Sequence, residues 1–268
     1  MCTLNYPTQS IMEKWLGCGS LQPLLVKFSW LNQSGKKNAG IISELIRVAN
    51  CKGPASNHLA NKSIIGLDMP VLVTDSDSEG KSKGTVVILA QDPLRGSTVQ
   101  TDIILGLPFA LQDGNAKGCT SVIRGSKDSI VEHLISKGYD VYLTDIFKLY
   151  MRDLQNNKVY PDENLYNEYL DLLRQELQQV GPAFVLTMGN EASRAMGTLS
   201  PYVHNLVHPS NNNNRQWKKL QTANPQILKT LDLADKMKYL TQDIDTYIQL
   251  LSSRTSGKCS CPCKLPCL

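Results

Sequence analysis

The sequence has no uninterrupted apolar run that approaches the roughly twenty residues a helix needs to cross a bilayer. Its first residues also lack a basic stretch followed by an apolar core, which is the pattern of a secretory signal. From these absences we expect a soluble intracellular protein, cytoplasmic or nuclear, that makes no membrane contact.

Side chains that favour a metal site are also few. The chain contains 4 histidines and 8 cysteines. Four of the cysteines, Cys259, Cys261, Cys263 and Cys267, crowd the last residues, but no histidine or second cysteine cluster lies near them in the sequence. A flexible Cys-rich tail over 253–268 is therefore favoured over a zinc site, which stays the alternative. We expect no metal and no other cofactor.

Strong positive charge is missing from the middle of the chain. The net charge is +4, and residues 85–220 hold 13 lysines and arginines against 14 aspartates and glutamates. Proteins that bind nucleic acid tightly usually have a positive face, because their cations displace counterions from the phosphates. The balance therefore argues against tight DNA binding. Arg215, Lys218 and Lys219 form one local basic cluster, which a solvated helix face explains at least as well.

The pattern that is present is one of alternating strands and helices. The chain has 268 residues, 41% of them hydrophobic, which is enough for one sizeable domain with extensions. Apolar runs predict strands at 86–90, 140–144, 183–188 and 203–207, and helical spacing predicts helices at 126–137, 164–180, 189–195 and 227–251. Right-handed connections then give an α/β fold, a three-layer α/β/α sandwich with a central four-stranded, mainly parallel sheet.

The other segments are expected to be extensions of this core. Residues 1–84 are mixed in composition and contain a helical pattern at 41–48. We expect them to form an N-terminal helical and loop extension that packs on the core. The core domain is expected over 85–252, followed by the flexible tail over 253–268.

Three short motifs stand at the ends of the predicted strands. The run at 86–90 stops at Gln91-Asp92-Pro93, and an apolar run of this kind suits a parallel strand that is covered on both faces. Open α/β sheets bind ligands beyond the carboxyl ends of such strands, which would put Asp92 in a pocket. A surface Asp-Pro turn is the alternative. Gly106-Leu107-Pro108-Phe109 follows, and the last strand ends in His208-Pro209-Ser210.

Together these motifs resemble the uracil-DNA glycosylase superfamily. In that family one strand ends in Gly-Gln-Asp-Pro, a Gly-Leu-x-Phe segment follows, and a second strand ends in His-Pro-Ser. Here Ala90 replaces the leading glycine, and the resemblance spans residues 85–220. It implies the same four-stranded sheet and a monofunctional DNA glycosylase of base-excision repair. Such an enzyme hydrolyses the bond to a flipped-out uracil or other deaminated or damaged base, in single- or double-stranded DNA. We expect a monomer.

The resemblance also implies roles for individual residues. Asp92 matches the carboxylate that positions the attacking water, and His208 matches the histidine that donates to the departing base. Gln91 matches a base contact and Phe109 the aromatic that stacks on the base. Ser210 matches a serine that contacts a phosphate.

Several positions depart from the family pattern. Asp145 stands where an asparagine would donate to uracil O4, and an ionised carboxylate can only accept. An ionised Asp145 can accept from an exocyclic amine, as on cytosine or adenine. Alternatively, burial raises the pKa of Asp145 and the neutral carboxyl donates. Leu94 replaces a tyrosine that blocks the methyl group of thymine, and Arg95 is expected to contact a phosphate. The last loop carries no apolar wedge, so Asn211 or Arg215 is left to fill the gap by hydrogen bonding, unless the substrate is single-stranded.

Two alternative functions remain possible from the sequence. A non-catalytic member that binds nucleic acid or protein is favoured by Asp145, by the loop without a wedge and by the neutral core. A nucleoside hydrolase on the same fold fits the weak positive charge but has no motif of its own. Asp92 and His208 favour the glycosylase.

Overall fold

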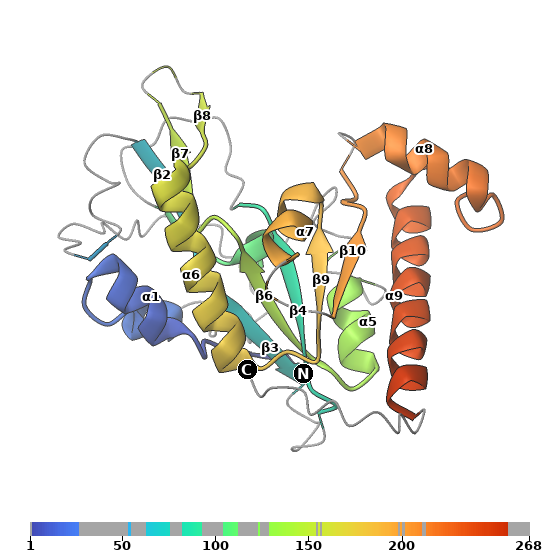
Figure 1. Ribbon diagram of the computed structural model, residues 1–268, viewed down its shortest axis with the longest axis horizontal. Coiled ribbons are helices and arrows are strands. Elements are labelled where there is room, and N and C mark those ends of the chain that lie inside the picture. The colour runs from blue at the N-terminus through green and yellow to red at the C-terminus, as the bar shows by residue number, and fades with distance from the viewer. Residues whose placement is uncertain are drawn as a thin grey trace.

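The computed structural model describes residues 2–26, 53–54, 63–75, 82–92, 104–111, 123, 129–153, 155, 157–197, 199, 202–210 and 213–256. Within these residues the chain forms two β-sheets, with helices packed around them (Figure 1). None of the described helices is both long and apolar enough to cross a membrane.

The main sheet has six strands in the order β1-β3-β6-β4-β9-β10. Four of them run parallel: β4 (Thr85–Ala90), β6 (Asp140–Asp145), β9 (Phe184–Met188) and β10 (Val203–Leu206). β4 lies between β6 and β9, and its residues 86–89 are fully buried, as expected for a central parallel strand. The predicted α/β fold with a mainly parallel central sheet is therefore confirmed, but the sheet has six strands rather than the four that we expected.

Helices cover both faces of this sheet. α5 (Ile130–Ser136) connects β4 to β6, and α6 (Glu163–Val180) connects β6 to β9 on the far side of β4. The two connections run in opposite directions across the sheet, so right-handed crossovers place α5 and α6 on opposite faces. α1 (Gln9–Leu16) packs on α6, and α9 (Leu233–Ser256) packs on α5 (Figure 1). α7 (Asn190–Met196) lies against β9 and β10.

Capping residues set the ends of the two connecting helices. The side chain of Asp162 accepts from the backbone N–H of Leu165 at 2.9 Å, and Gly181 ends α6 with a φ of 60°. Ser129 caps α5 in the same way by accepting from the N–H of Glu132 at 3.4 Å. α5 therefore begins at residue 130, whereas the sequence pattern placed its start at 126.

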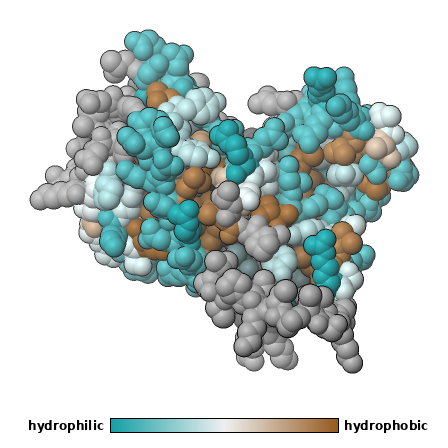
Figure 2. All heavy atoms as spheres, in the orientation of Figure 1, coloured by the Kyte–Doolittle hydropathy of each residue, from teal (hydrophilic) through white to brown (hydrophobic). Residues whose placement is uncertain are grey.

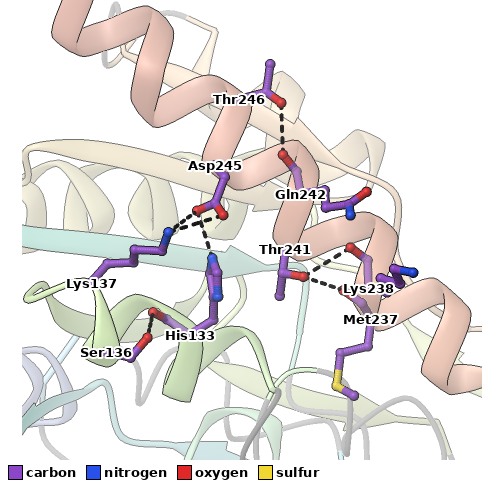
Figure 3. A network of polar contacts seen from close by, with 9 residues as sticks. All are labelled: His133, Ser136, Lys137, Met237, Lys238, Thr241, Gln242, Asp245 and Thr246. Carbon is purple, nitrogen blue, oxygen red and sulfur yellow. Dashed lines mark hydrogen bonds and ion pairs between the residues drawn. The ribbon is translucent and has the colours of Figure 1, made fainter. Parts of the chain in front are cut away.

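Polar contacts join α5 to α9. Asp245 of α9 accepts from Nε2 of His133 at 2.9 Å and from Nζ of Lys137 at 3.1 Å, and both donors lie on α5 (Figure 3). Burial raises the pKa of Asp245, but the hydrogen bonds from His133 and Lys137 outweigh it and lower the pKa. His133 therefore has a structural partner at the helix interface.

The second sheet was not predicted. Its strands are β5 (Ile104–Gly106), β2 (Ser63–Asp68), β7 (Leu149–Arg152) and β8 (Lys158–Val159), in that order. Two of them have only three and two residues, which is too short for a readable period of two. β7 and β8 form a hairpin that follows soon after β6, so the second sheet stands beside the carboxyl end of the main one (Figure 1).

The N-terminal region is more than the helical and loop extension that we expected. β1 (Cys2–Asn5) and β3 (Val71–Asp75) are strands of the main sheet, and β2 belongs to the second. β3 is antiparallel to both β1 and β6, so β1 runs in the same direction as β6. The reason is that β6 would otherwise leave an unpaired edge, which these strands cover. The helical pattern at 41–48 and the tail beyond 256 lie outside the described residues, and the domain boundaries remain predictions.

Candidate active site

Asp92 stands beyond the carboxyl end of β4. The strand ends at Ala90, and Gln91 and Asp92 follow directly. The Asp92 side chain is 8% exposed, and its Oδ2 forms an ion pair with the ammonium group of Lys158. Lys158 is the first residue of β8, and 28% of its side chain is exposed. A cation from the second sheet thus holds the carboxylate.

Asp145 lies at the same edge. β4 and β6 are parallel and pair Ala90 with Asp145, which is buried with 3% of its surface exposed. The backbone N–H of Phe147 donates to the carbonyl of Gln91 at 2.9 Å, which joins the two strand ends. Gln91, Asp92 and Asp145 therefore share one edge of the sheet.

A buried ion pair supports Asp145 from the interior. Lys148 and Glu176 are both fully buried, and Nζ of Lys148 lies 2.8 Å from Oε1 of Glu176. The same ammonium donates to the hydroxyl of Thr144 at 2.6 Å and to the backbone carbonyl of Asp145 at 2.5 Å. The Thr144 hydroxyl in turn donates to Oε2 of Glu176 at 2.8 Å. The network fixes the end of β6, and with it the backbone of Asp145.

His208 follows β10 on the other side of the site. β10 is separated from β4 by β9 alone, so the two strands lie about 10 Å apart. The backbone N–H of Ser210 donates to Nδ1 of His208 at 3.2 Å, which places the proton of the neutral ring on Nε2. Burial lowers the pKa of His208 and favours this neutral form. The ring is thereby prepared as a neutral donor through Nε2.

The backbone around His208 is held by side chains from α8 (Asn214–Ala223) and α9. The carbonyl of His208 accepts from Nε1 of Trp217 at 3.0 Å and from Nδ2 of Asn213 at 3.2 Å. The carbonyl of Pro209 accepts from Nζ of Lys236 at 3.1 Å. Trp217 and Lys236 are buried, and the ammonium lies 5.4 Å from the centroid of the Trp217 ring. These contacts fix the loop from the interior.

Phe109 has an unusual backbone conformation. It lies in a single 3₁₀ turn, Pro108–Ala110, which follows β5 and packs near β6. Its φ of 56° makes it the one non-glycine residue in the left-handed region among those described. Such a conformation costs about 1–3 kcal/mol for a bulky residue and is concentrated at functional sites. The ring is partly buried against the core.

The remaining predicted residues are not all gathered at the edge. Leu94, Arg95 and Asn211 lie outside the described residues. Ser210 is partly buried and contacts His208 through its backbone. Arg215 is exposed near the start of α8.

The surface is hollowed above these strand ends. Figure 2 shows an indentation between the part of the molecule that carries the β7–β8 hairpin and the part that carries α8, and the parallel strands end toward it (Figure 1). The basic cluster of α8, namely Arg215, Lys218 and Lys219, is exposed. In the described part of the chain, no group of three histidine, cysteine, aspartate or glutamate side chains is placed to hold a metal ion.

Sequence reasoning missed four charged residues that support the site: Lys148, Lys158, Glu176 and Lys236. Two of them had a readable signal. Lys148 interrupts an apolar run directly after β6, and Glu176 shares the apolar stripe of α6 with Leu173 and Leu177. Opposite charges at two core positions indicate a buried pair. Lys158 and Lys236 stand in polar surroundings of the sequence, where exposure is the default expectation.

Comparison with known families supplies an independent result. Residues 78–232 match the model of the uracil DNA glycosylase superfamily. The matched stretch contains all four parallel strands and the three motifs. A search of curated proteins found no match. The resemblance that rested on three short motifs is thus confirmed at the level of the family.

Proposed function

Because the chain belongs to the uracil DNA glycosylase superfamily, we propose that it is a monofunctional DNA glycosylase of base-excision repair. It hydrolyses the N-glycosidic bond of a flipped-out uracil or other deaminated or damaged base, and it acts inside the cell as a monomer. The observation that carries this function is that His208, whose Nδ1 accepts from Ser210 so that Nε2–H is free to donate, and Asp92 follow parallel strands of the same sheet.

The two residues act on opposite sides of the bond that breaks. The departing base leaves as an anion, and Nε2–H of His208 donates to its O2 as the negative charge develops. Asp92 positions the attacking water and stabilises the cationic sugar. Lys158 contacts Oδ2 of Asp92, so we assign the water to Oδ1. The products are the free base and an abasic sugar, and the step needs no metal or cofactor.

The other residues hold the base and the flanking DNA. Phe109 stacks on the flipped base, and the side chain and backbone of Gln91 contact its edge. The sequence match to the family assigns Leu94 to the position that faces a methyl group at C5. On the resemblance to the family, the phosphates are contacted by four residues: Arg95, Ser210, Asn211 and Arg215. Charged and backbone donors of this kind position the strand without reading its sequence.

The first test is base release from oligonucleotides that contain uracil, hypoxanthine, xanthine or only normal bases, in single- and double-stranded form. Asp92→Asn removes the charge but keeps the shape, and we expect release to fall by about 10²–10⁴-fold. Asp171→Asn is the matched control, because Asp171 is an exposed residue of α6. Release that Asp92→Asn leaves intact would contradict the assignment of Asp92.

Base selection is tested at Asp145. Two acceptors facing each other in a dry pocket cost several kcal/mol. If the carboxylate opposes uracil O4, Asp145→Asn should raise uracil release by about tenfold or more, whereas Asp145→Ala, which supplies no donor, should not. An unchanged or lower rate for Asp145→Asn removes this explanation of base preference.

A catalytically weak or inactive member that binds nucleic acid or protein is the second candidate. It is favoured by the ion pair that already engages Asp92 and by the buried carboxylate of Asp145. A folded protein that binds DNA but releases none of the four classes of base would support this candidate over the glycosylase.

A further inference from the structure

Tyr160 is an unusually exposed aromatic next to the site. Among the described residues, the large hydrophobic side chains that remain exposed are Val26, Tyr160, Tyr202 and Leu250, and Tyr160 is the most exposed at 63%. It follows β8 directly. A large ring left in water beside the site is a candidate contact for a ligand rather than for the core.

A single ammonium group links this ring to the proposed catalytic carboxylate. Nζ of Lys158 lies 4.8 Å from the centroid of the Tyr160 ring, and the same Nζ pairs with Asp92. It also lies 6.0 Å from the ring of the buried Tyr150. Tyr160 is therefore separated from Asp92 by one charged group. A nucleotide beside the reacting one can reach it, whereas a distant one cannot.

The hairpin next to the ring is held by backbone pairing and by side-chain hydrogen bonds. β7 and β8 pair in a fixed register, with Met151 opposite Val159. The turn between them is closed by Asp153 and Asn157: the N–H of Asn157 donates to Oδ1 of Asp153 at 2.7 Å, and its Nδ2 donates to Oδ2 at 3.0 Å. A ring on such a support is placed before any ligand arrives, which lowers the entropy lost on binding.

The chemistry of this pair suits an unpaired nucleobase. An exposed ring beside a cation is the unit by which proteins bind single strands, with a base stacked on the ring and the cation near the phosphate. The ammonium covers one side of the Tyr160 ring, and the ring remains mostly in water. In a duplex both faces of a base are already covered by its neighbours, so only an unstacked base can use the ring.

On the premise that the protein is a DNA glycosylase, we propose that Tyr160 is a stacking platform for the unpaired base next to the target nucleotide. Lys158 supports the platform, and the preferred substrate is single-stranded DNA. The sequence 211–214 consists of four asparagines and has no apolar side chain with which to replace a base flipped out of a duplex. Both features favour a strand that has no partner.

Binding of a fluorescent oligonucleotide of normal bases, single-stranded or as a duplex at one fixed salt concentration, tests this site. Tyr160→Ala is expected to weaken single-strand binding by about tenfold and duplex binding little. Tyr160→Phe keeps the ring and is expected to bind like the wild type. Tyr202→Ala is the matched control, since Tyr202 is 40% exposed but lies at the amino end of β10, on the far edge of the sheet.

Three results would overturn the platform. They are unchanged single-strand binding by Tyr160→Ala, an equal loss for single strand and duplex, and a loss with Tyr160→Phe as large as with Tyr160→Ala. Base release measured on the same proteins separates this inference from the proposed function. Asp92-dependent release together with wild-type binding by Tyr160→Ala rejects the platform and keeps the glycosylase. The expected Tyr160 pattern without any release rejects the glycosylase and keeps a single-strand site.

Discussion

Lys148 and Lys236 are buried, with exposed fractions of 0% and 1%, whereas 28% of the Lys158 side chain is exposed. Each buried ammonium donates to the backbone carbonyl of a residue at the site, Lys148 to Asp145 and Lys236 to Pro209. Lys158 instead contacts the side chain of Asp92 from the β7–β8 hairpin. The interior side of the site is therefore held through its backbone, and the hairpin side through a side-chain contact at the surface.

This difference has a physical consequence. A buried ammonium cannot turn to water, so the backbone it holds keeps its position unless the fold itself loosens. A partly exposed ammonium exchanges its carboxylate for water or phosphate at little cost. In the proposed function, the interior side fixes where the base is bound, while the ammonium on the hairpin side can change partners when a strand enters. Four substitutions test this division, beginning with the largest expected effect.

Lys148→Met breaks the buried pair and leaves Glu176 without its cation. We expect a loss of about 3–5 kcal/mol in the free energy of unfolding, because an uncompensated charge then stays buried. Urea denaturation measures this, with Lys219→Met on the exposed face of α8 as the control. A loss below about 1 kcal/mol would mean that Lys148 contributes no more to stability than an exposed lysine, which would contradict the division.

His208→Ala removes the proposed donor, and we expect base release to fall by about 10²–10³-fold while binding of DNA changes little. The pH dependence of stability sharpens the test. Burial lowers the pKa of His208 from its ordinary 6.5, so the unfolded chain takes up its proton first as the pH falls. The contribution of the neutral His208 to the free energy of unfolding is therefore fully present above about pH 6.5, and it is lost as the pH falls from that value to the lowered pKa. His208→Ala should lack this decline, as measured by urea unfolding from pH 8 to 5, and an equal decline in both proteins would contradict the neutral buried ring.

Lys236→Met removes the donor to the Pro209 carbonyl. The unsatisfied carbonyl is expected to cost about 1–3 kcal/mol of stability. Lys236 is a positioning residue, so Lys236→Met should lower kcat by about tenfold, because His208 shifts. It should leave KM nearly unchanged, because the contacts to the DNA strand remain. Lys238→Met, an exposed lysine of the same helix, is the control. A change confined to KM would contradict the positioning role.

The residues that follow the strand ends could be predicted from the sequence, whereas the charged residues that support them could not. Three of the four parallel strands, β4, β6 and β9, were readable because each is a nearly continuous buried run. In β10 only Leu206 is buried, and the strand was readable mainly from the His208 motif that follows it. Asp92, Asp145 and His208 were placed by the same rule, since parallel strands end at one edge. The sequence motifs thus located the strand ends and the residues that follow them.

The supports of these residues were not readable in the same way. β8 has only two residues, so its pairing with β7, and hence the position of Lys158, depends on tertiary contacts. Lys148 and Glu176 violate the rule that charged side chains face water, and their pairing joins residues 28 positions apart. Lys236 lies on an amphipathic helix whose register against Trp217 no local pattern specifies. The positions of Lys158, of the Lys148–Glu176 pair and of Lys236 therefore depend on packing between distant segments.

Lys158→Met is expected to have the smallest effect on stability, about 1 kcal/mol, because 28% of the Lys158 side chain is exposed and water can replace its ammonium beside the 8% exposed Asp92. Its effect on DNA binding is expected to be distinct. If the ammonium exchanges Asp92 for a phosphate when a strand enters, one released counterion is lost, and the slope of log affinity against log salt for single strands should fall by about 0.7. Lys229→Met, an exposed lysine outside the site, should leave that slope unchanged. An unchanged slope for Lys158→Met would mean that the ammonium stays on Asp92 in the complex, and a stability loss of about 3 kcal/mol or more would make the hairpin side as fixed as the interior.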